Sequence, residues 1–122
     1  MIWYGEPPFL ECSTLGDRRF SAFCARVNGR SIEEQYQAAK RFEDGSTGLH
    51  WRQAKGRRPV NDAETRQLYR DLWDQYIWEN PHLLDVIIAQ TGLCDSYGRP
   101  GFPCQATELW RIRNEYYSLC RV

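Results

Sequence analysis

The sequence lacks several features that mark large classes of protein. It contains no run of the roughly 18 apolar residues that a membrane span requires, and its first residues, MIWYGEPPF, have neither the basic region nor the apolar stretch of a signal peptide. Its 16 basic and 16 acidic residues cancel, so no overall positive field favours nucleic acid, and any recognition of phosphate has to be local. We therefore expect a cytoplasmic protein without a membrane partner.

Paired metal ligands are also missing. The five cysteines form no C-x-x-C pair, and His50 and His82 stand alone in the sequence, as is typical of surface or capping residues. A zinc site is therefore not expected. Cys94 and Cys104 could pair if oxidised, but a reducing compartment argues for free thiols. We predict no metal and no cofactor.

The chain does contain enough apolar material for one domain. Its 122 residues suffice for one core but not for two, so residues 1–122 are expected to form a single domain. Aromatic residues make up 14% of the chain, including five Trp and seven Tyr. This is more than a small core needs, and we expect some of these rings to be partly exposed or to line a pocket.

Turn signals and hydrophobic periodicity divide the chain into short strands followed by helices. Strands are expected over residues 2–4, 9–10 and 25–27, and they would form a small antiparallel sheet. Helices are expected from residue 32 to about 40, over 49–55, 62–78 and 105–119, and from 81 to near 92, with 93–103 as a loop. The predicted fold class is α+β: a single compact domain, mainly helical, with a small N-terminal antiparallel sheet.

A stripe of polar residues follows the first helix start. Ser31 and Glu34 have the spacing of a capping box, which predicts a helix from about Ile32. Glu33, Gln37 and Lys40 then fall on one flank of that helix, beside its apolar face. Spacing alone favours an ordinary solvated flank. The place of Glu33 in the first turn, where the helix dipole stabilises a carboxylate, favours a site.

Two further clusters have both a functional and an ordinary interpretation. Arg52, Lys55, Arg57 and Arg58 surround Gly56, an arrangement that suits a phosphate but is also found in solvated basic loops. Later in the chain, Asp95, Tyr97 and Gly98 lie in a loop. Turn chemistry alone explains Asp and Gly there, while an aromatic ring beside an Asp would also stack on a base and orient a water.

Several of these segments, taken in order, resemble the NADAR family, also called YbiA-like. Its members carry an F-S-N-F start, a D-G-K or N-G-K turn, and a helix of the form E-H-Y-x-Q-A-x-K. The resemblance covers roughly residues 20 to 98. The matching segments are residues 20–23 (FSAF), 27–30 (VNGR), 33–40 (EEQYQAAK), 56–57 (GR) and 83–92 (LLDVIIAQTG).

Two departures from the family pattern lie in the second half of the chain. Tyr97 stands where family members usually have Trp, and residues 104–109 (CQATEL) replace a Gly-x-Asn-x-Leu-Gly run. Both belong to the far wall of the expected pocket, so they bear on which substrate it takes and on turnover.

The resemblance implies an N-glycosidase that cleaves a ribose–nitrogen bond, either removing ADP-ribose from an ADP-ribosylated nucleobase or hydrolysing a related ribosyl nucleotide. Glu33 would stabilise the positive charge that builds on the sugar, and Lys40 would donate a proton or attack C1′. Asp95 would orient water. The substrate-binding residues would be Phe20, Ser21, Gln37, Gly56, Arg57 and Tyr97, with Arg57 on the phosphate and Tyr97 stacked on the base.

Other functions remain open at this point. The expected partner is a small nucleotide or an ADP-ribosylated base, free or in modified nucleic acid, but a binding module could keep the fold without turnover. The short chain is also compatible with a phage or mobile-element accessory protein. A third alternative is an interaction protein that uses exposed Trp3, Trp78 and Tyr117.

Overall fold

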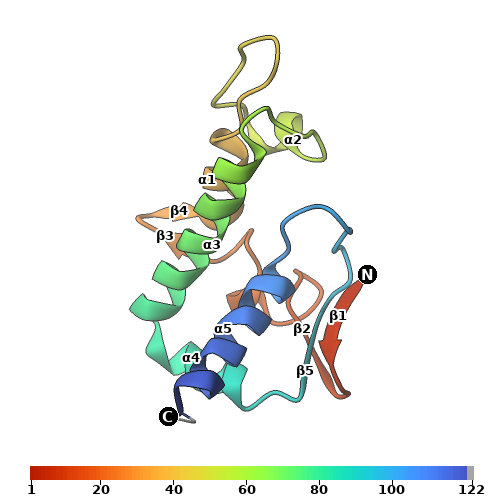
Figure 1. The fold of residues 1–122 in the computed structure, drawn as a ribbon, viewed down its shortest axis with the longest axis vertical. Helices are drawn as coiled ribbons and strands as arrows, with labels where there is room; N and C mark the ends of the chain where they lie inside the picture. Colours follow the sequence, from red (N-terminus) through yellow and green to blue (C-terminus); the bar gives the residue numbers. More distant parts are fainter. Residues whose placement is uncertain (121–122) are drawn as a thin grey trace.

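The computed structural model describes residues 1–120 and shows one long helix that links two groups of shorter elements. This helix, α3 (Asp62–Glu79), runs between the end that holds α1 (Ile32–Ala38) and α2 (Trp51–Ala54) and the end that holds α4 (Pro81–Ile88) (Figure 1). The last helix, α5 (Gln105–Cys120), packs against α3 and α4 and also against the sheet. A short 3-10 helix, η1 (Arg18–Phe20), precedes them all.

The main sheet is mixed, and its central strand comes from the second half of the chain. β5 (Gly92–Asp95) lies between β1 (Ile2–Gly5), which is antiparallel to it, and β2 (Phe9–Glu11), which is parallel to it. The predicted N-terminal antiparallel sheet is therefore wrong in its topology. The loop predicted over residues 93–103 is wrong for residues 93–95, which belong to β5, and is confirmed for residues 96–103. β5 is a four-residue strand that is buried throughout, so it shows no alternation and gives no strand signal in the sequence.

A second, two-stranded sheet pairs β3 (Arg26–Val27) with β4 (Arg30–Ser31). The connecting residues, Asn28 and Gly29, have φ angles of 55° and 81°. Both are left-handed, as a tight hairpin turn of the Asn-Gly type requires. This turn pairs β3 with β4 and places the start of α1 directly after β4.

The helix starts agree with the sequence signals better than the helix ends do. α1 begins at Ile32, and Ser31 Oγ accepts a hydrogen bond from the Glu34 amide at 3.1 Å. Glu34 does not close the capping box, because its carboxylate lies 3.6 Å from Arg30. α1 ends before Lys40, so the predicted stripe is only partly helical.

None of the helices within residues 1–120 combines the length and the apolar character of a membrane span.

A single hydrophobic core joins the helices to the sheet, which confirms an α+β domain. Its fully buried side chains come from every part of the chain, and the largest apolar ones are Phe20, Ile32, Trp73, Ile87, Leu93 and Leu109. Leu119, in the last turn of α5, is 75% exposed. Trp3 and Trp78 are also exposed, as the third alternative above requires.

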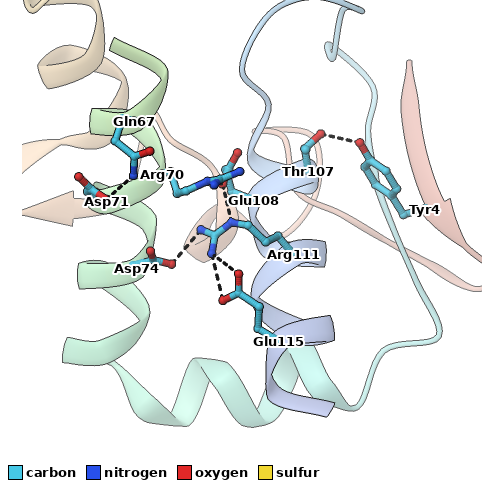
Figure 2. Close-up of polar contacts among 9 residues, drawn as sticks. All are labelled: Tyr4, Gln67, Arg70, Asp71, Asp74, Thr107, Glu108, Arg111 and Glu115. Atoms are coloured by element: carbon cyan, nitrogen blue, oxygen red, sulfur yellow. Dashed lines mark hydrogen bonds and ion pairs between the residues drawn. The ribbon is translucent and has the colours of Figure 1, made fainter. Parts of the chain in front are cut away.

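Polar contacts fix α5 against α3 and β1 (Figure 2). The Arg111 guanidinium donates to Asp74 of α3 at 2.8 Å and to Glu108 on its own helix at 2.9 Å. At the other side of α5, the hydroxyls of Thr107 and Tyr4 are 2.7 Å apart. These contacts hold the first turns of α5 beside the carboxyl end of β5, where the polar cavity described below is found.

The end of β1 offers a test of how tightly the sheet packs. Gly5 has φ of +76°, and a Cβ at this position would lie 2.3 Å from the Thr91 carbonyl oxygen and 2.6 Å from the Trp110 ring. Gly45 has a similar φ of +84° with nothing within 4 Å. We predict that Gly5→Ala lowers the free energy of unfolding by roughly 2–5 kcal/mol, since left-handed strain and overpacking add.

The matched variant Gly45→Ala carries the left-handed strain alone and should cost about 1–2 kcal/mol. Urea denaturation followed by circular dichroism measures both values. Equal costs for the two variants would show that Gly5 is not packed against Thr91 and Trp110.

Candidate functional site

A cavity of about 110 Å³ opens between α1, the turn that follows α2, and the loop between β5 and α5. Acids, amines and aromatic rings line it together. Six of the residues predicted from the sequence are among them: Glu33, Gln37, Lys40, Gly56, Asp95 and Tyr97. The fold thus brings three separate segments of the chain to one place.

Glu33 lies in the first turn of α1 and is 8% exposed. Its amide donates to the Ala22 carbonyl at 2.9 Å, which fixes the start of the helix against the preceding segment. Its Oε1 accepts a hydrogen bond from Gln37 Nε2 at 2.8 Å. Burial raises the pKa of Glu33 above its ordinary value, although the bond from Gln37 and the charges of Lys55 and Lys40 oppose the rise.

Gln37 is a buried amide that is only half satisfied. Its side chain is one turn beyond Glu33 and its Nε2 is used by that carboxylate. Its Oε1 is buried and accepts no hydrogen bond from residues 1–120. A buried acceptor without a donor costs about 1–3 kcal/mol. A hydroxyl group at this end of the cavity would supply the missing donor.

Lys40 is 1% exposed and follows directly after α1. Its Nζ donates to the carbonyls of Arg57 at 2.8 Å and Ala54 at 3.1 Å, and lies 5.2 Å from the centre of the Tyr36 ring. Burial lowers the pKa of Lys40, while the charge of Glu33 opposes this. The two carbonyls leave one position on Nζ, which is an N–H when the amine is charged and a lone pair when it is neutral.

Asp95 is the last residue of β5 and is 4% exposed. Its Oδ2 accepts from Gln105 Nε2 at 2.8 Å and from the Cys104 thiol at 3.1 Å, and its Oδ1 accepts from the Tyr97 amide at 3.0 Å. Gln105 Oε1 in turn accepts from the Ala22 amide at 2.9 Å. One buried side chain therefore connects Asp95 to the segment that also holds the start of α1.

The turn after Asp95 is held by a residue of the neighbouring strand. Glu11 of β2 accepts hydrogen bonds at Oε2 from the amides of Ser13 and Ser96, each at 3.1 Å, and at Oε1 from the Ser96 hydroxyl. Ser96 stands between Asp95 and Tyr97 in the sequence. The parallel pairing of β2 with β5 thus positions both residues of the predicted site that lie in this turn.

Cys104 contributes a thiol to the lining of the cavity. All five cysteines are free, and burial with the nearby charge of Asp95 raises the pKa of Cys104 to about 12. The Cys104 thiol is therefore able to donate to Asp95 at neutral pH. Within residues 1–120, no group of three or more His, Cys, Asp and Glu side chains is arranged to hold a metal ion.

Three residues of the predicted site do not line this cavity. Phe20 and Ser21 are fully buried in the segment beneath it. The Arg57 guanidinium stacks 3.9 Å from the centre of the Phe42 ring and lies in a separate groove with Asp44. Only the backbone carbonyl of Arg57 reaches the site, through Lys40. The Arg57 side chain therefore does not reach this cavity, where the resemblance implies that it would bind a phosphate.

The cavity is also lined by residues that are not part of the site predicted from the sequence. Lys55 belongs to the basic cluster, and Phe23 to the FSAF segment, so both had a signal nearby. Gln105 and Arg99 had none, because they lie at a helix start and in a Gly- and Pro-rich segment and reach the cavity only through the tertiary fold. The additional lining residues with chemical interest are Phe23, Lys55, Tyr69, Arg99, Phe102 and Gln105.

Comparisons of this chain with protein-family models, with curated proteins and with solved structures found no match. The resemblance to the NADAR family therefore stays a prediction. The chemistry of the cavity has to be interpreted from its own geometry.

The buried carboxylate of Glu33 predicts a pH-dependent effect on stability. The pKa of Glu33 in the folded protein is above the ordinary 4.5. At a pH between the unfolded-state and the folded-state pKa, the folded state therefore binds more protons than the unfolded state. The free energy of unfolding falls as pH rises through this range. We predict that the stability of Glu33→Gln relative to the native protein increases as pH rises above about 4.5. Each kcal/mol gained corresponds to roughly 4 °C in Tm.

The control for this measurement is Glu34→Gln, one residue further along the same helix. The Glu34 side chain is 48% exposed and makes only a surface pair with Arg30, so its effect should stay within about 0.5 kcal/mol. Thermal denaturation across the pH range measures both variants. A Glu33→Gln variant that loses stability relative to the native protein as pH rises contradicts the assignment.

Lys40 predicts a loss of stability when its amine is removed. Lys40→Met keeps the buried stem but removes both hydrogen bonds to the turn after α2, and we expect it to cost about 1–3 kcal/mol. Lys55→Met serves as the control, because Lys55 is exposed and should change stability by less than about 0.5 kcal/mol. Urea denaturation measures the free energy of unfolding of both variants. Equal values would contradict a stabilising role for the two hydrogen bonds from Lys40 to the turn after α2.

Proposed function

We propose that this protein is an N-glycosidase that hydrolyses a ribose–nitrogen bond, with an ADP-ribosylated nucleobase or a related ribosyl nucleotide as substrate. The observation that carries the proposal is the convergence of Glu33 and Lys40, from α1 and its end, with Asp95, from the end of β5, on one cavity. Two acids and an amine, buried together, match what the reaction requires: charge stabilisation, proton transfer and activation of water.

Glu33 has the role of stabilising the transition state. As the C1′–N bond breaks, positive charge develops on the sugar, and a fixed carboxylate in a buried site interacts strongly with it. The carboxylate is held by Gln37, and the positive charges of Lys40 and Lys55 favour its ionised form. A buried carboxylate of this kind costs stability when no substrate is bound, which is common at functional sites.

Lys40 and Asp95 account for the protons. The electron pair of the broken bond goes to the nitrogen of the leaving base, which takes a proton from Lys40. Water adds to C1′ and gives its proton to Asp95, and exchange with solvent then returns Asp95 and the Lys40 amine to their starting protonation states. Asp95 Oδ2 already accepts two hydrogen bonds while Oδ1 accepts one, so Oδ1 is the oxygen that would hold the water.

The opening of the cavity suits a flat, aromatic leaving group. Tyr97 is 63% exposed and lines the cavity together with Phe23, which is 37% exposed. Rings at an entrance can stack on a nucleobase whichever base it is. Gln37, with its unsatisfied Oε1, lies at the inner wall, where a ribose hydroxyl would donate to it.

The test is hydrolysis of ADP-ribosylated guanosine and ADP-ribosylated thymidine, with release of free ADP-ribose followed by chromatography. We predict turnover by the native protein and a loss of roughly 100-fold or more in Glu33→Gln, the size expected when one charge-stabilising group is removed. Glu34→Gln, its exposed neighbour on α1, should keep the native rate. Full activity in Glu33→Gln would disprove the mechanism.

The same assay separates the enzyme from a binding module. If ADP-ribose or an ADP-ribosylated nucleoside raises the Tm but no product forms under any condition, the protein binds the ligand without turnover. Product release by the native protein excludes that alternative.

A further inference from the structure

A group of positive charges without acidic partners lies at the mouth of the cavity. Lys55 follows α2, Arg99 follows the Asp95–Gly98 turn, and both line the opening. The Arg99 Nη1 lies 3.9 Å from the position that a Cβ on Gly56 would take, so its guanidinium lies against the residue next to Lys55. Among the ion pairs of residues 1–120, none includes Lys55, Arg58 or Arg99.

Aromatic rings pack against these cations, and no side-chain hydrogen bond to another of residues 1–120 occupies their donor groups. Lys55 Nζ is 5.2 Å from the centre of the Phe23 ring, and the guanidinium carbon of Arg99 is 5.2 Å from that of Phe102. Arg58 lies at 5.1 Å from the same Phe102 ring. A guanidinium that stacks on a ring still presents its N–H groups at its edge, where they can bind a phosphate in bidentate fashion.

Like charges gathered in this way repel one another, and an anion between them relieves the repulsion. The acids that face these cations are Glu33 and Asp95, which lie deeper in the cavity. Positive charge without an ion-pair partner therefore lies at the mouth of the cavity, whereas the inner wall holds the two acids together with the Lys40 amine. A ligand with an anionic and a neutral end enters such a site with the anionic end outside.

We infer that Lys55 and Arg99 form a phosphate subsite at the mouth of the cavity, selecting ligands whose ribose carries a phosphate or a diphosphate. The orientation of the ribose toward Glu33 rests on the proposed function, whereas the binding of phosphate does not require turnover. Arg57, the phosphate-binding residue that the resemblance to the NADAR family implies, is not part of this subsite. Its side chain stacks on Phe42 outside the cavity.

The experiment is a calorimetric titration of the full chain with pyrophosphate at low and at physiological salt. We expect binding that weakens as salt rises. Lys55→Met and Arg99→Met should each weaken it at least tenfold, since each removes a charge-assisted contact. Arg99→Lys should fall between Arg99→Met and the native protein, because a lysine keeps the charge but not the bidentate geometry.

Two matched controls test whether any cation of the basic segment would serve. Arg52 stacks on Trp51 at 5.2 Å and Arg57 on Phe42 at 3.9 Å, and neither lines the cavity. Arg52→Met and Arg57→Met should bind pyrophosphate within twofold of the native protein. Circular dichroism melts of all variants separate a lost subsite from a lost fold.

A second titration compares ADP-ribose with adenosine, which has a similar nucleoside but no phosphate. The native protein should prefer ADP-ribose by at least tenfold, and Lys55→Met and Arg99→Met should reduce that preference.

Failure of the subsite and failure of the glycosidase are distinguishable. The inference is overturned if the native protein does not bind pyrophosphate at low salt, if Lys55→Met and Arg99→Met bind like the native protein, or if Arg57→Met loses as much affinity. Any of these results leaves a measured turnover intact. Conversely, anion binding that depends on Lys55 and Arg99 without release of ADP-ribose supports the subsite and rejects the N-glycosidase.

Discussion

The cavity depends on how the fold satisfies the charged and polar groups that it buries. Glu33, Lys40 and Asp95 are each less than a tenth exposed, and an isolated buried charge is too costly to persist. Gln105 is central here, because its amide donates to Asp95 and accepts from Ala22. The Ala22 carbonyl then accepts from the Glu33 amide. A short series of hydrogen bonds thus fixes both carboxylates relative to each other, and α5, which supplies Gln105, is itself fixed to α3 by Arg111 (Figure 2).

This arrangement combines a stable frame with a site that works against stability. Two of the three positions on the Lys40 amine bind the carbonyls of the turn after α2, so Lys40 positions the mouth of the cavity as well as lining it. Glu33 accepts one hydrogen bond from Gln37. The burial that this bond does not offset destabilises the charged form and raises the pKa of Glu33. Such a carboxylate contributes little to folding, which agrees with the role in charge stabilisation that we propose for Glu33.

The local elements could be predicted where a pattern of neighbouring residues determines them. The Asn28–Gly29 turn, the helix start at Ile32 and the Asn80–Pro81 helix start each depend on a few adjacent residues, and all three are present. β5 could not be predicted in this way. It is stable only because β1 and β2 pair with both of its edges, and a short buried strand of this kind has no periodicity of its own. The sheet was therefore assigned the wrong topology.

For the site, the sequence by itself determined the residue types and their local spacing: a carboxylate in the first turn of a helix, an amide one turn later, and an aspartate beside a turn. These depend on contacts between near neighbours in the chain. Only the tertiary structure decided which of these residues line the same cavity, because that depends on how α1, β5 and α5, which are far apart in the sequence, pack together. It brought Gln105 and Arg99 to the cavity and turned Arg57 away onto Phe42. Side chains only two residues apart, such as Lys55 and Arg57, face different surroundings because Gly56, with φ of +78°, forms a turn between them.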